Sequence, residues 1–232
     1  MNLLAFDTST EVFSVAVQRG AGDAHESLEH SAAGGAQASA ALIPAIQDLL
    51  ARAGLRLADL DAIVMGRGPG SFTGLRTACS VAQGLAFGAG LPVLPVDTLL
   101  AVAEDAHWRA GVTQVVAVLD ARMDEVYWAH YVRQAGRWAQ QGDFALGRPE
   151  TVVVPDQWAL AGNAFSFFGE RLAGAIRIEA LPTAAALLRL APALLAAGRA
   201  GPASAALPLY IRDKVAQTTA ERAALRRAAA RP

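Results

Sequence analysis

Two segments of the chain, separated by about half of its length, resemble each other. LLAFDTSTEVFSVAVQRG occupies residues 3–20, and VAVLDARMDEVYWAHYVRQAG occupies residues 116–136. In each segment an aspartate, Asp7 or Asp120, ends an apolar run and is followed by a polar link, a Glu-Val-aromatic triplet and a second strand-like run. The pattern predicts two β-hairpins, and the shared order of aspartate, glutamate and strands favours duplication over chance. We therefore expect two related lobes that each open with a hairpin.

The strands of these hairpins differ in how they should be buried. The first strands, residues 3–6 and 115–119, are continuously apolar, which is typical of central strands in a sheet. In the second strand of the first copy, Phe13, Val15 and Val17 alternate with Ser14, Ala16 and Gln18, so they should share one face.

Helical and strand-like segments alternate between the two hairpins. We expect strands at 61–65 and 91–96, helices at 39–53 and 71–87, and a loop or edge strand at 25–37. Residues 140–155 are expected to be rich in loops. The alternation predicts an α/β fold. The first helix should turn one apolar stripe toward the core, formed by Leu42, Ile43, Ile46, Leu49, Leu50 and Ala53.

Length and composition allow two lobes. The chain has 232 residues, of which 53% are hydrophobic and 18% charged, enough to build a substantial core. A formal net charge of −1 argues against a protein that, without a partner, binds nucleic acid through bulk positive charge. One cysteine, Cys79, favours a reducing compartment. No secretory signal or uncharged transmembrane stretch is recognised, so we expect a cytoplasmic protein with no membrane partner.

A glycine-rich loop, MGRGPGSFTGLR at residues 65–76, joins an expected strand to an expected helix. It lacks the lysine of a P-loop, and Ser71 stands where the dinucleotide pattern requires a third glycine. Ser71 or Thr73 can cap the helix, whose free amides attract anions. The alternative is that the glycines allow a tight turn and close strand–helix contact, and the pattern alone favours this structural interpretation.

Asp7 begins the turn Asp7-Thr8-Ser9-Thr10 after the first strand. Actin-like ATPases and sugar kinases have an aspartate and a glycine-containing phosphate loop at this place, but no glycine stands in this turn. Asp7 is a candidate ligand for a Mg²⁺-bound water, although capping the turn is favoured. The candidate nucleotide contacts are Asp7, Thr8, Ser9, Gly68, Gly70, Ser71 and Thr73.

Other chemical signatures are sparse. Four histidines, His25, His30, His107 and His130, lack metal-site spacing, so we predict no metal site. Neither H-E-x-x-H nor G-x-S-x-G occurs. Cys79 is expected to be a buried small side chain. The terminal arginines are interpreted as a solvated helix end, with contact to nucleic-acid phosphates as the alternative: Arg222, Arg226, Arg227 and Arg231.

The helices expected at 39–53 and 71–87 have smooth, nearly uncharged outer faces. Small residues let a second helix approach closely, and an exposed aromatic residue is typical of an interface anchor. The alternative is that both helices are buried inside this chain. The candidate partner interface comprises Ala40, Ala41, Pro44, Gln47, Ala51, Arg76, Thr77, Ser80, Gln83, Gly84 and Phe87.

Four motifs follow one another along the chain: LLAFDTST, GRGPGSFTGLRTACSVAQGLAFG, LDARMDEVYWAHY and PLYIRDKVA. Together they resemble the TsaB family, also called YeaZ, of bacterial threonylcarbamoyladenosine biosynthesis. The resemblance spans almost the full chain and is loose at 137–180. It implies an actin-like ATPase fold, as in Hsp70 and sugar kinases and related to ribonuclease H. The first lobe would be residues 1–105, a reduced second lobe residues 106–213, and a basic helix residues 214–232, which can pack back on the first lobe.

The resemblance also implies a function. The chain would be a non-catalytic paralogue of TsaD, the transferase that modifies N6 of the adenosine 3′ of the anticodon. Its partners would be TsaD and the ATPase TsaE, with a homodimer when alone and tRNA reached indirectly through the complex. The helices at 39–53 and 71–87 would form the TsaD interface. Relatives often carry His or Arg before the proline of the first helix, whereas residues 37–41 here are nearly all small.

No cofactor is expected for this chain, with a weak or composite ATP or ADP site as a candidate. Two enzyme hypotheses compete with the subunit hypothesis. An autonomous actin-like ATPase or small-molecule kinase would use Asp7 and the glycine loop. A metalloprotease, suggested by an older family label, has no plausible ligand set and is the weakest interpretation.

Overall fold

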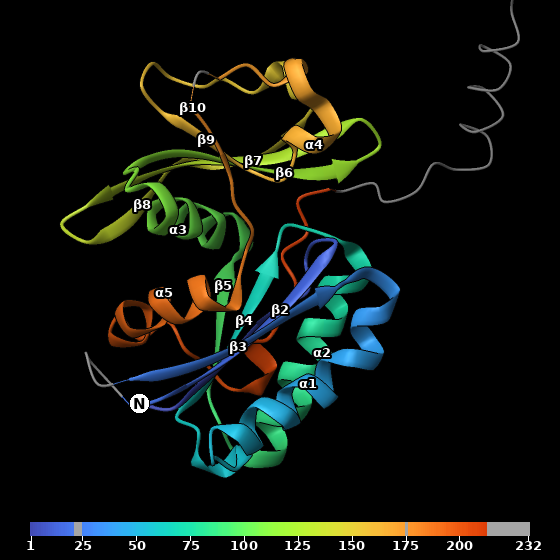
Figure 1. Cartoon of the computed structure of the whole chain (residues 1–232), viewed down its shortest axis with the longest axis vertical. Coiled ribbons are helices and arrows are strands. Elements are labelled where there is room, and N and C mark those ends of the chain that lie inside the picture. The colour runs from blue at the N-terminus through green and yellow to red at the C-terminus, as the bar shows by residue number, and fades with distance from the viewer. Residues whose placement is uncertain (21–24, 175, 213–232) are drawn as a thin grey trace, which may run out of the picture.

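The computed structural model describes residues 1–20, 25–174 and 176–212. The basic helix expected at 214–232 and the terminal arginines lie outside the described residues. Two five-stranded sheets, one in each lobe, form the framework of the chain (Figure 1). Within the described part of the chain, no helix is both long enough and apolar enough to cross a membrane.

Both sheets have the same topology. The first has the order β3-β2-β1-β4-β5 and the second the order β8-β7-β6-β9-β10, so each strand has a counterpart five numbers later. In each sheet the first three strands pair antiparallel and the last two continue in parallel. The duplication predicted from the hairpins is therefore confirmed. The strands are β1 Leu3–Asp7, β2 Val12–Arg19, β3 Glu26–Ala33, β4 Ala62–Gly68, β5 Val93–Asp97, β6 Gln114–Arg122, β7 Glu125–Gln134, β8 Arg137–Gly147, β9 Ala159–Gly162 and β10 Ile176–Glu179.

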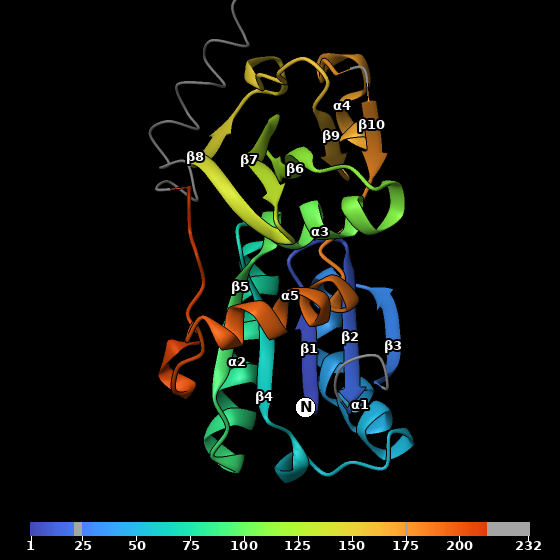
Figure 2. The same cartoon turned by 90° about the vertical axis from the view of Figure 1, so that its left-hand side faces the viewer.

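Helices cover both faces of the first sheet. On one face α1 (Ala38–Arg52) and α2 (Phe72–Ala89) pack over Leu4 and Phe6 of β1. On the other face α5 (Ala184–Ala196) packs over Leu3 and Ala5 (Figure 2). Because alternate residues of β1 face two different helical layers, the strand is apolar throughout.

The second sheet has fewer helices. α3 (Thr98–Ala110) lies between the lobes and packs against β6, and the four-residue α4 (Phe165–Phe168) lies beyond β9. Tyr131 and Leu119 belong to the core beside α3, and Val116 and Val118 belong to a core on the opposite face. The second lobe therefore has a thinner helical cover than the first.

The chain returns to the first lobe near its end. α5 and residues 203–206 follow the second sheet in sequence, yet they pack on the first sheet and its helices. This packing supplies apolar cover for the second face of the first sheet, through Leu187 and its neighbours. The division into 1–105, 106–213 and 214–232 stays a prediction about the chain. The last part of 106–213 nevertheless packs with the first lobe.

Two local expectations need correction. Ile43 is 43% exposed, because it lies at the edge of the α1 stripe, whose buried residues are Ala38, Leu42, Ile46, Leu49 and Leu50. Residues 137–147, expected to be partly loop, form the edge strand β8.

Candidate functional site

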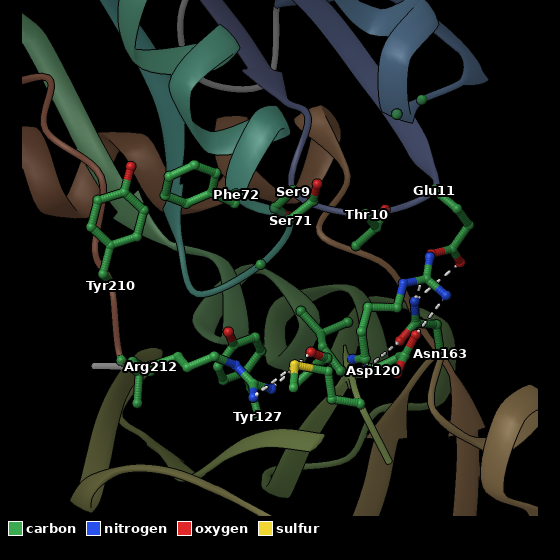
Figure 3. A pocket seen from close by; sticks show the side chains of 18 of the residues that line it. Ser9, Thr10, Glu11, Ser71, Phe72, Asp120, Tyr127, Asn163, Tyr210 and Arg212 are labelled. Carbon is green, nitrogen blue, oxygen red and sulfur yellow. Dashed lines mark hydrogen bonds and ion pairs between the residues drawn. The ribbon is translucent and has the colours of Figure 1, made fainter. Parts of the chain in front are cut away.

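The two hairpin turns face each other across a cleft between the lobes. The cleft has a volume of about 370 Å³. The first lobe contributes the β1–β2 turn at 9–11 and the glycine loop at 70–72, and the second contributes the β6–β7 turn at 119–123 and Asn163. Residues 209–212 form another wall (Figure 3). Duplication thus places the two aspartate turns, those of Asp7 and Asp120, on opposite sides of one cavity.

Asp7 lies below the floor of this cleft and caps its own turn. Its side chain is buried, and Oδ1 accepts hydrogen bonds from the Ser9 amide at 2.8 Å and the Ser9 hydroxyl at 2.6 Å. Oδ2 has no hydrogen-bond partner among the described residues. Burial raises the pKa of the Asp7 carboxyl from 3.8 to about 6, and the bonds from Ser9 offset part of that rise. The capping role favoured from the sequence is the one that this geometry supports.

Asp7→Asn should change how stability depends on pH. Because the folded-state pKa of Asp7 is raised, the native protein binds a proton more tightly than the unfolded chain, and stability falls as pH rises from about 4 to about 6. A shift of this size corresponds to roughly 3 kcal/mol lost above pH 6. Asparagine keeps the oxygen that accepts from Ser9 and removes the charge. Urea unfolding should therefore give Asp7→Asn a free energy of unfolding about 1–3 kcal/mol above wild type at pH 8, with little difference near pH 4.

The exposed Asp143→Asn is the matched control and should follow the wild-type pH profile. If Asp7→Asn and wild type lose stability in parallel between pH 4 and pH 8, the buried carboxyl does not govern this dependence.

The glycine loop is pressed against the Asp7 turn. A Cβ atom at Gly66 would lie 1.7 Å from Asp7 Oδ2, one at Gly70 2.6 Å from the Ser9 carbonyl oxygen, and one at Gly74 1.8 Å from the Thr8 carbonyl oxygen. The Ser71 amide donates to the Ser9 carbonyl oxygen at 2.8 Å. Glycine at these positions therefore permits close contact between the loop and the turn, which favours the structural interpretation.

The seven candidate nucleotide contacts do not gather in one place. Ser9, Gly70 and Ser71 line the cleft. Asp7 and Thr8 are about 1% exposed, so a ligand in the cleft cannot reach them in this arrangement. Gly68 is buried, and its missing Cβ would lie 2.7 Å from the Leu209 carbonyl oxygen. Thr73 is exposed in the first turn of α2 and does not line the cleft. Ser71, as one of the two expected N-caps, accepts from the Gly74 amide.

Several cleft residues were not predicted. Glu11 accepts from the Asn163 side-chain amide at 3.0 Å and so joins the two lobes. Asp120 pairs with Arg122 at 2.9 Å across its own turn. Arg212 pairs with Glu125 at 2.7 Å and donates to the Ala121 carbonyl oxygen at 3.0 Å. Asp120 could have been identified as a cleft residue from the sequence, since the internal repeat aligns it with Asp7.

The candidate interface residues of α1 and α2 are all exposed or half-buried. Phe87 is 85% exposed. The two helices together contain three charged residues, of which Asp48 and Arg52 pair with each other at 3.2 Å. The outer faces are therefore smooth in the structure, as predicted from sequence. Their role as an interface stays a prediction.

Two residues of that face have partners within the chain. We call residues 206–212 the C-terminal strap, because this segment runs along α2 and then crosses to the second lobe (Figure 2). Gln83 Nε2 donates to the Ala206 carbonyl oxygen at 3.0 Å, and Arg76 Nε donates to the Tyr210 hydroxyl at 3.1 Å. The smooth face is thus bordered by the strap, which the sequence did not reveal.

No metal centre is evident among the described residues, since no group of three or more His, Cys, Asp or Glu side chains there can hold an ion. Cys79 is buried, as expected, and burial raises the pKa of its thiol to about 11.

Comparison with known proteins gives the family. The family model for TsaD, tRNA N6-adenosine threonylcarbamoyltransferase, matches residues 29–220. The tRNA threonylcarbamoyladenosine biosynthesis protein TsaB of Escherichia coli is 37% identical over 231 residues, covering 93% of this chain and 96% of that protein. The chain belongs to the TsaB family.

Other TsaB relatives agree in sequence and in structure. The TsaB protein of Haemophilus influenzae is 37% identical over 235 residues, with 93% of this chain and 95% of that protein covered. YeaZ from Pseudomonas aeruginosa superimposes with a TM-score of 0.82 at 41% identity, covering 90% of this chain and 99% of that one. The two-lobed, duplicated sheets are the actin-like ATPase fold expected for this family.

Proposed function

We propose that this chain is a non-catalytic subunit that binds and activates a TsaD transferase in tRNA threonylcarbamoyladenosine synthesis. The observation that carries the proposal is the exposed face of α1 and α2, which holds almost no charge and presents Phe87 to solvent. Ordinary solvated helices carry Lys and Glu on their outer faces, whereas helix-docking faces carry small and apolar residues. The reaction assisted would be modification at N6 of the adenosine 3′ of the anticodon.

We expect a partner with the same fold to pack its helices against the exposed face of α1 and α2. The TsaD family model matches residues 29–220, a range that includes α1 and α2, and we propose that a TsaD protein presents a comparable helix pair. Two such pairs can pack as a four-helix arrangement, with Gly84 and Ala40 allowing close approach of the backbones. The same face predicts a homodimer of this chain in the absence of the transferase.

The remaining assignments follow from this arrangement. TsaE would join the pair, tRNA would be reached through the complex, and the site of action would be the cytoplasm. We assign this chain no cofactor of its own, because Asp7 is buried and Asp120 is paired with Arg122. An ATP or ADP shared with a partner would meet Ser9, Gly70 and Ser71.

Size-exclusion chromatography with light scattering tests the proposal. The purified chain, alone and mixed with TsaD from the same organism, should elute as a dimer and as a one-to-one complex respectively. A chain that forms no complex, hydrolyses ATP alone and loses that turnover in Asp7→Ala would instead support the autonomous ATPase.

A further inference from the structure

The C-terminal strap packs along α2, next to the helix pair. It lies antiparallel to α2, because Ala206 meets Gln83 while Tyr210, later in the strap, meets Arg76 and Phe72, earlier in the helix. Its backbone is fixed at the centre, where the Leu209 amide donates to the Arg67 carbonyl oxygen at 2.7 Å. The strap is thus held at several points and presents a defined outer side.

That outer side is apolar. Leu207 is 60% exposed and Tyr210 45%, and on the adjacent edge of α2 Phe72 is 37% and Phe87 85% exposed. Ten large apolar side chains are exposed among the described residues, and these four, with Ile43 of α1, make up half of them. Exposed apolar residues concentrated on adjoining elements are typical of an interaction surface.

One unpaired charge lies within this surface. The Arg76 guanidinium is 3.7 Å from the centre of the Phe72 ring, and its Nε donates to the neutral Tyr210 hydroxyl (Figure 3 shows Phe72 beside Tyr210). No carboxylate of the described residues pairs with Arg76, whereas the other two charges of α1 and α2 neutralise each other. An exposed arginine stacked on an aromatic ring keeps its terminal amino groups available for a carboxylate.

We propose that the strap and α2 form one docking surface, and that the TsaD partner covers Leu207 and Tyr210 while placing a carboxylate against Arg76. This inference rests on the proposed function and deepens it, because it extends the interface beyond the helix pair and specifies the charge of the partner. A single cation in an apolar surface fixes the register of a partner more than it adds affinity.

Isothermal titration of TsaD into the chain tests the inference. Arg76→Glu and Leu207→Asp should each weaken binding by about tenfold or more. Arg137→Glu, at an exposed arginine of β8 in the second sheet, is the control and should bind as wild type does. The affinity of Arg76→Gln for TsaD should fall less steeply with added salt than the affinity of the wild type. Circular dichroism verifies that each variant is folded, and both tested side chains are exposed.

The outcomes separate the two proposals. If wild type binds TsaD and both Arg76→Glu and Leu207→Asp bind equally well, the strap lies outside the interface and this inference is wrong, while the proposed function stands. If wild type does not bind, the proposed function itself fails. Weakening by both variants, with the control unchanged, supports the inference.

Discussion

Gly74→Ala should lower the free energy of unfolding by more than about 3 kcal/mol. A Cβ atom at this position would lie 1.8 Å from the Thr8 carbonyl oxygen, and the atom it meets belongs to the backbone. The same two residues are joined by the Thr8 hydroxyl, which donates to the Gly74 carbonyl oxygen at 2.6 Å. Relief therefore requires α2 to move away from the β1–β2 turn. Urea denaturation monitored by circular dichroism measures the effect.

Gly84→Ala is a matched control in the same helix. No atom lies within 4 Å of the position that its Cβ would occupy, so the change should stabilise the protein by up to about 1 kcal/mol through helix propensity. Similar free energies of unfolding for Gly74→Ala and Gly84→Ala would show that the helix and the turn are not in tight contact.

Gly84→Arg should reduce affinity for TsaD by about 100-fold or more, equivalent to about 3 kcal/mol. The position is open in the isolated chain, so the arginine does not disturb folding. In the proposed complex it lies where two helix backbones approach closely, and a long charged side chain there is buried without a partner. Titration calorimetry with the purified transferase measures the loss.

Ala193→Arg provides the control for this variant. Ala193 is exposed on α5, which covers the opposite face of the first sheet from α1 and α2. It should bind TsaD with wild-type affinity. Equal affinities for Gly84→Arg and wild type would remove the outer face of α2 from the interface.

The hairpins and the parallel strands could be predicted because their signals are local. β1 is apolar since it is covered on both faces, and the alternation in β2 reflects the burial of Phe13, Val15 and Val17 in one core. Prediction from the sequence failed most where burial leaves no periodic pattern of apolar residues. β8 is an edge strand with polar residues on much of its length, so the sequence there resembles a loop. Ile43 shows that helical periodicity does not define the edge of a stripe.

The candidate site was harder to predict because its contacts are distant in sequence. Glu11 meets Asn163, and Gln83 meets Ala206, across separations of 152 and 123 residues. The strap has no helical or strand periodicity, so nothing local predicts where it lies. The glycine loop was predicted as a junction, but its closeness to Asp7 follows from the packing of two strands and a helix.

The location of the docking surface is the central claim, and hydrogen exchange measured with and without TsaD tests it most directly. We predict that TsaD slows exchange in α1 and α2 and in the strap, while residues 119–127 at the second-lobe wall of the cleft keep their rates. Slowed exchange confined to the cleft or the second sheet, with α1 and α2 unchanged in a complex that forms, would contradict the account.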